Sequence, residues 1–251
     1  MKSSIFIISI LVSGAFSGLI YGGINLFVVE PFLDEAIGLE NQHLFESGKA
    51  EDTPQFWIEY EGYRTWQKGG QIFASVILGI VFGSLFGIIF SLSKDSLPGN
   101  SFMKKSLILS GVLWATIFLI PFLKYPSNPP TVGEEETIVL RTTLYLMFIG
   151  ISGFGALGFY KISKKLYKNK RWFALLGFGA FILSIFILMP ENPDKIFAPM
   201  ELVNNFRIAS ALSLTCFWII LGFIHGLFWQ KIDRKSTRLN SSHVRTSRMP
   251  S

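Results

Sequence analysis

Six long apolar segments, separated by short polar loops, constrain what this chain can fold into. The first runs from Ser4 to Val29, and a helix of that length, at ~1.5 Å per residue, crosses a ~30 Å hydrocarbon layer. It lacks a small-residue cleavage site, so we interpret it as a retained span. Five more follow at residues 70–91, 105–122, 139–160, 172–189 and 207–229. The pattern and a mean hydropathy of +0.44 predict an all-α integral membrane protein with six transmembrane helices, forming one polytopic domain over residues 1–232.

The last segment, residues 233–251, departs from this pattern. It has no apolar periodicity, and its sequence is similar to sequencing-adapter DNA translated in one frame. We interpret it as non-native, with a genuine basic tail as the alternative, and leave it out of the reasoning on fold and function. The tail supplies much of the net charge of +6. The single cysteine, Cys216, offers no disulfide framework.

Lysine and arginine in the loops predict the orientation. Six spans place both termini on one side, and the basic residues of that side include the cluster between Lys161 and Arg171. The opposite side holds fifteen of the sixteen acidic residues that precede residue 233. We therefore expect both termini to be cytoplasmic and the acidic loops to face outward. The Lys161–Arg171 loop is too short for a nucleic-acid groove, and contact with anionic membrane lipids explains it better.

Glycine spacing indicates which spans pack closely. Gly14, Gly18 and Gly22 recur at every fourth residue in the first span, and the second span repeats the spacing at Gly79, Gly83 and Gly87. Small residues at this spacing lie on one helix face and let two helices approach each other. We predict close packing of spans 1 and 2, although glycine is also generally common in membrane helices.

The three loops of the acidic side share an order of residues. Each begins with a proline, passes acidic residues and reaches an arginine near the next span: Pro31 to Arg64, Pro121 to Arg141 and Pro190 to Arg207. This order suggests three parallel hairpin repeats, although proline termination and interfacial arginine could produce it independently. Arg141 and Arg207 would be unfavourable at helix starts unless paired, and we expect partners among the nearby acids Glu134, Glu135, Glu136, Glu191 and Glu201.

The acidic stretch after the first span is the main candidate for chemistry. On one interpretation Pro31 starts a new helix, with Asp34 in an early turn where the helix dipole favours negative charge. On the other, Glu30 with Asp34 and Glu40 with His43 share helix faces and bind a divalent first-row metal. His43 could equally be an ordinary loop histidine.

Other polar features add little chemistry. His225, in the sixth span, is either a relay or exit ligand for an ion or a packed, neutral side chain. Pro121 is expected to end the third span, and Pro126, Pro129 and Pro130 predict a rigid, extended loop after it. No phosphate-binding loop and no pairing of nucleophile and base are present, so neither ATP hydrolysis by that route nor catalysis is expected.

Three separated motifs resemble the CbtA family, the proposed cobalt transporter subunit. They are the stretch Glu30–Glu40, the stretch Leu123–Gly133 followed by Arg141, and Met189-Pro-Glu with Asn205-Phe-Arg207. The resemblance implies uptake of Co²⁺ across the prokaryotic inner membrane, linked to cobalamin synthesis, with no permanently bound cofactor and a small histidine-bearing membrane partner, CbtB. A non-transporting accessory subunit is the alternative. The metal, the energy source and any homo-oligomeric state stay open.

Overall fold

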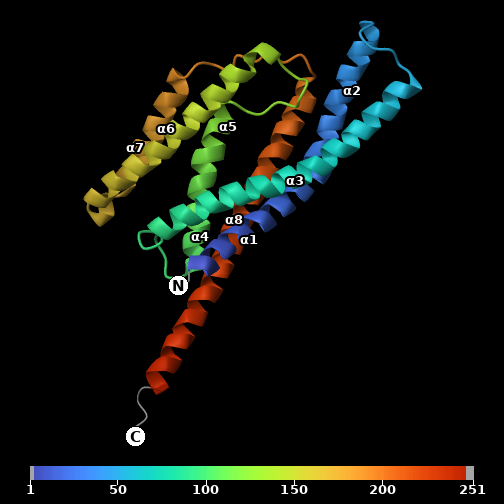
Figure 1. Cartoon of the computed structure of the whole chain (residues 1–251). Helices are drawn as coiled ribbons and strands as arrows, with labels where there is room; N and C mark the ends of the chain where they lie inside the picture. Colours follow the sequence, from blue (N-terminus) through green and yellow to red (C-terminus); the bar gives the residue numbers. More distant parts are fainter. Residues whose placement is uncertain (1–2, 247–251) are drawn as a thin grey trace. The chain divides into compact units, whose positions relative to one another are not determined.

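The computed structural model describes residues 3–246, and every element in that part of the chain is a helix (Figure 1). The order is α1 (Ser3–Ile24), η1 (Asn25–Val29), α2 (Glu30–Glu46), α3 (Pro54–Ser93), α4 (Phe102–Leu113), η2 (Trp114–Leu119), α5 (Ile120–Lys124), η3 (Glu135–Thr137), α6 (Ile138–Lys165), η4 (Lys168–Lys170), α7 (Trp172–Leu188) and α8 (Met200–Thr246). Residues 247–251, the end of the segment that we interpret as translated sequencing adapter, lie outside the described residues.

Six helical stretches of the described chain are long and apolar enough to cross a membrane. They are Ile5–Glu46, Pro54–Ser93, Phe102–Lys124, Glu135–Lys165, Lys168–Leu188 and Met200–Lys231. Each contains one of the predicted apolar segments almost entirely, so the six spans are confirmed. The chain is a multi-pass, all-α membrane protein.

The helices belong to two compact units. The first contains the chain up to Glu30, Glu51–Gly111 and the chain from Ala211 onward, and the second contains Pro31–Ala50 and Val112–Ser210. The divisions fall inside the helical stretches of spans 1, 3 and 6, so one part of each of these three spans belongs to the first unit and the rest to the second. Each unit is described by itself below.

Glycine packing holds α1 against α3 in the first unit, where the two helices run side by side (Figure 1). A Cβ atom added at Gly14 would overlap the carbonyl oxygen of Gly79, and one at Gly18 would overlap that of Ser75. The paired residue numbers run in opposite senses, so the helices are antiparallel. The predicted contact between the two glycine triplets is confirmed, and it depends on the absence of side chains at these positions.

Serine residues join α4 to α8 in the same unit. Ser106 Oγ donates to the carbonyl oxygen of Gly222 over 2.7 Å, and Ser110 Oγ donates to that of Trp218. Both serines are buried, and Gly222 provides the space for Ser110. Small residues thus bring these two helices together as well, here through hydrogen bonds to backbone carbonyls.

The second unit packs α6 against both η2 and α7. Ser152 of α6 donates to the Thr116 carbonyl oxygen over 2.5 Å, while Gly155 accommodates the ring of Phe181 from α7. Contacts between the fourth and fifth spans are not part of the predicted hairpin scheme. The parallel repeat of three hairpins therefore stays a prediction.

Neither Pro31 nor Pro121 interrupts its helical stretch. Pro31 lies in the first turn of α2, as one interpretation expected, whereas the prediction that Pro121 ends the third span is wrong. Glu30 and Ile120, the residues before them, both have helical φ and ψ values. Proline lacks an N–H, and its ring collides with the carbonyl four residues earlier in a regular α-helix. Both prolines directly follow the short π-helices η1 and η2, whose wider turns displace that carbonyl and let the helix continue.

Candidate functional site

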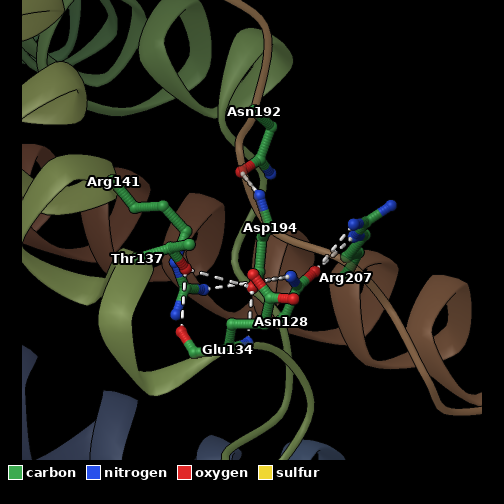
Figure 2. A network of polar contacts seen from close by, with 7 residues as sticks. All are labelled: Asn128, Glu134, Thr137, Arg141, Asn192, Asp194 and Arg207. Carbon is green, nitrogen blue, oxygen red and sulfur yellow. Dashed lines mark hydrogen bonds and ion pairs between the residues drawn. The ribbon is translucent and has the colours of Figure 1, made fainter.

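The most connected polar group in the second unit is the carboxylate of Asp194 (Figure 2). Its side chain is fully buried and lies in the loop between α7 and α8. Arg141 Nη1 and Asn128 Nδ2 each donate to Asp194 Oδ2 over 2.6 Å, and the backbone N–H of Glu134 donates to Oδ1 over 3.0 Å. These three donors satisfy the hydrogen-bonding capacity of a carboxylate that has no contact with water.

Asn128 extends this network to the start of α8. Its Oδ1 accepts from Arg207 Nη2 at 2.7 Å and from Arg207 Nε at 3.2 Å, while its Nδ2 donates to Asp194. The loop after α5 therefore binds an arginine of α8, and the loop before α8 binds Arg141 of α6 (Figure 2). We call Asn128, Glu134, Thr137, Arg141, Asn192, Asp194 and Arg207 the Asp194 network.

Backbone geometry explains why the loop can approach Asp194. Gly133 has φ +119°, and a Cβ atom there would overlap the Asp194 carboxylate. Two residues earlier Thr131 has φ +70°, and between them Val132 is buried against Ala36, Leu202 and Val203. The prolines keep the preceding segment out of any helix, as predicted. Glycine is required at 133 by both its φ value and the close approach of the carboxylate.

Tyr125 fixes the other end of the same loop. Its hydroxyl donates to the Pro190 carbonyl oxygen over 2.7 Å, and its ring packs on Leu144 and Phe148. Burial raises the pKa of the Tyr125 phenol, which keeps the hydroxyl protonated and able to donate. A cavity of about 290 Å³ lies beside it, lined partly by Tyr145, Arg141 and Asn128.

The predicted partners of the two arginines are wrong. Arg141 binds Asp194, and Arg207 binds Asn128, whereas the carboxylate of Glu134 pairs with Lys195 at 3.2 Å. Glu135, Glu136, Glu191 and Glu201 are exposed, so water already solvates them. Asp194 was left out of the expected partners although it lies nearer to Arg207 in sequence than Glu191 does. The available signal was its position between Pro193 and Pro199, in a loop on the same predicted side of the membrane as Arg141 and Arg207.

Glu30, the first predicted metal ligand, is buried in the first unit. Its Oε1 accepts from Arg64 Nη2, and Arg64 Nη1 donates to Gln67 Oε1 over 2.6 Å. Glu30 and Arg64 are 4% and 8% exposed, so the ion pair is largely removed from solvent. Any cation at Glu30 would have to use Oε2 or compete with Arg64.

The other predicted ligands do not come together with Glu30 in one cluster. Asp34 is half-buried, and Glu40 and His43 are exposed on α2. Within residues 3–246, no group of three or more His, Cys, Asp or Glu side chains is arranged to hold a metal ion. A cation at this stretch would therefore also need water, amide or backbone oxygens, or ligands from another subunit.

His225 is packed among aromatic rings in the first unit. Its ring lies 5.0 Å from those of Phe86 and Phe90 and 5.8 Å from that of Trp229, and it is 1% exposed. Its Nε2 has no hydrogen-bond partner among the described residues. These surroundings suit a neutral ring. A role in ion exit stays a prediction.

Comparison with protein-family models gives a match. The model of the CbtA family, described as a probable cobalt transporter subunit, matches residues 4–230. No curated protein matches the chain, and no solved structure does. The matched residues include most of the six spans, the Glu30–Arg64 pair and the whole Asp194 network. Because the match covers most of its length, this chain belongs to the CbtA family of probable cobalt transporter subunits.

Proposed function

We propose that the chain is a membrane subunit of a cobalt uptake transporter in the prokaryotic inner membrane, with its acidic loops facing outward to capture Co²⁺. The family match over residues 4–230 is the observation that carries this proposal. Members of this family are described as subunits of a transporter, which supports an assembly of this chain with other chains. The loop charges support the direction, because lysine and arginine are enriched on the cytoplasmic side of membrane proteins.

Capture would begin on the exposed part of α2. Glu40 and His43 lie one turn apart and are both exposed, so a hydrated cation can reach them. A carboxylate and an imidazole are both ligands for first-row divalent metals. Negative charge along the loops would also raise the local cation concentration. Asp34 and Glu30, closer to the first span, would take the ion next, and His225 would act at its exit.

The Asp194 network would support this function as a scaffold. The Asp194 carboxylate is fully buried and already accepts three hydrogen bonds of 3.0 Å or shorter, so it is a poor candidate for a metal ligand. Its contacts hold two loops and the starts of two spans at fixed positions. Such a scaffold would keep the entry side rigid while an ion passes.

Uptake of Co²⁺ by cells that depend on this chain tests the capture role. The double variant Glu40→Gln with His43→Ala removes both exposed ligands, and we expect uptake at limiting Co²⁺ to fall several-fold while uptake at saturating Co²⁺ changes little. Glu46→Gln, an exposed change on the same helix, is the matched control. Unchanged uptake in the double variant at limiting Co²⁺ would reject these residues as capture ligands.

A second candidate function is that of an accessory subunit that binds a partner and does not itself transport. The absence of a cluster of three potential metal ligands in the described residues favours it. A small membrane protein carrying histidines, similar to CbtB, could supply the missing ligands. Co²⁺ uptake can be compared between native membranes that contain this chain alone and membranes that also contain such a protein. Uptake only in the presence of the second protein would show that the partner is required.

A further inference from the structure

Two spans carry the same irregularity at equivalent positions. At the end of η1 the N–H of Glu30 donates to the Asn25 carbonyl, and at the end of η2 the N–H of Ile120 donates to the Ala115 carbonyl. In both cases the next residue is a proline, which has no N–H. The carbonyl that follows in each helix belongs to Leu26 or Thr116. The N–H four residues ahead of it is already bonded to the preceding carbonyl, and the residue five ahead is the proline, so neither can donate to it.

In the second unit this freed carbonyl is satisfied by another helix. Ser152 Oγ donates to the Thr116 oxygen over 2.5 Å, and Ser152 is fully buried. An unpaired carbonyl inside a bilayer costs several kcal/mol, because no water is present to replace the lost donor. The serine is thus the expected solution where a π-turn and a proline together expose a carbonyl.

In the first unit the freed carbonyl has no such partner. Among the described residues no side chain donates a hydrogen bond to Leu26, although Ser213 of α8 donates to Asn25 Oδ1 over 2.5 Å one residue earlier. Helix carbonyls point toward the C-terminal end of a helix, so the Leu26 oxygen is directed toward the turn that contains Glu30. Glu30 uses Oε1 for Arg64. One helical turn therefore carries three residues whose oxygens can accept further contacts.

We propose that the Leu26 carbonyl oxygen is a ligand for a divalent cation, together with Asn25 Oδ1, the Glu30 carboxylate and water. This inference rests on the proposed function, and it adds a backbone ligand to the predicted acidic site. Interrupted helices in other transporters expose carbonyls that coordinate ions. Because Arg64 already pairs with Oε1 of Glu30, a cation has only Oε2 and neutral oxygens to bind and is held weakly, which suits a site that must also release it.

The variant Pro31→Ala tests the carbonyl directly. Alanine restores an N–H five residues after Leu26 and lets the π-turn relax into an α-helix, which withdraws the carbonyl from a cation. Binding of Co²⁺ alone to the purified full-length chain, measured by titration calorimetry, should weaken by at least about tenfold. Pro121→Ala is the matched control, because Ser152 already covers the carbonyl in that span. Its affinity should stay within about twofold of the parent.

The variant Asn25→Asp tests the same site in the opposite direction. A carboxylate keeps an acceptor for Ser213 and binds a divalent cation more strongly than an amide oxygen, so Co²⁺ affinity should rise by about tenfold or more. Circular dichroism reports whether each variant is folded. If Pro31→Ala does not fold, Asn25→Asp decides alone, and unchanged affinity overturns the proposal. It is also overturned if the parent binds no Co²⁺, or if a folded Pro31→Ala variant binds as the parent does.

Transport measurements on the same variants separate this inference from the proposed function. Affinity changes as expected, without any Co²⁺ uptake into vesicles, would support the site and reject the transport role. Uptake by the parent, with affinities unaffected by either substitution, would support transport and reject the Leu26 site.

Discussion

Arg141 Nη1 lies 2.6 Å from Asp194 Oδ2, which joins the start of the fourth span to the loop between the fifth and sixth spans. Only the arginine retains some exposure, since its side chain is 25% accessible while that of Asp194 is inaccessible. The contact crosses 53 residues of sequence. Together with Asn128 and Arg207 it makes the two loops of the second unit interdependent.

Asp194→Asn should destabilise the second unit. The substitution removes the charge that Arg141 and Asn128 bind, and we expect a loss of about 2 kcal/mol, below the ~3–5 kcal/mol of fully buried pairs because Arg141 is partly solvated. Thermal unfolding in detergent measures the change. Glu191→Gln, an exposed change in the same loop, should leave the midpoint where it is. Equal midpoints for both variants would show that the network adds no stability.

Gly79→Ala should separate α1 from α3. Its Cβ atom would overlap the Gly14 carbonyl oxygen, so the helices must move apart, and we expect a cost of about 1–3 kcal/mol. Gly69→Ala is the matched control on the same helix, because nothing lies within 4 Å of a Cβ atom there. The control should be neutral or slightly stabilising. Unfolding by a denaturing detergent compares the two, and an unaffected Gly79→Ala variant would contradict the packing.

Ser152→Ala should leave the Thr116 carbonyl without a donor. Hydrogen bonds between membrane helices average ~0.6 kcal/mol and reach ~1.7, and this buried contact should lie near the upper value because the helix offers no replacement. Ser184→Ala removes a hydroxyl that bonds only to its own helix, at Ala180, and serves as the control. The comparison uses the unfolding midpoint of each variant. A smaller effect at Ser152 than at Ser184 would argue against an exposed carbonyl at the π-turn.

The Glu30–Arg64 pair should behave as a coupled unit. Glu30→Gln and Arg64→Gln each remove one charge of the buried ion pair and leave the other in place, whereas the double variant removes both charges. We expect the double variant to be more stable than the sum of the two single effects by about 1–3 kcal/mol. A double-mutant cycle of unfolding free energies gives this value. Additive effects would mean that the two side chains do not interact in the folded protein.

The sequence predicted the spans and their glycine contact because both depend on local patterns. Apolar length determines which segments can cross a bilayer, and a four-residue spacing places Gly14 and Gly18 on one face of any helix. The partners of Arg141 and Arg207 depend instead on how distant loops fold together, and Asp194 is separated from Arg141 by 53 residues. Proline chemistry was considered without the π-turn, which is why Pro121 was wrongly expected to end the third span.

Uptake of radioactive Co²⁺ into lipid vesicles that contain this chain alone tests the central claim most directly. We expect uptake that saturates with Co²⁺ concentration, exceeds that of empty vesicles and falls at limiting Co²⁺ in the Glu40→Gln, His43→Ala double variant. Uptake no greater than in empty vesicles, by protein shown to be folded, would contradict transport by this chain and favour the accessory role.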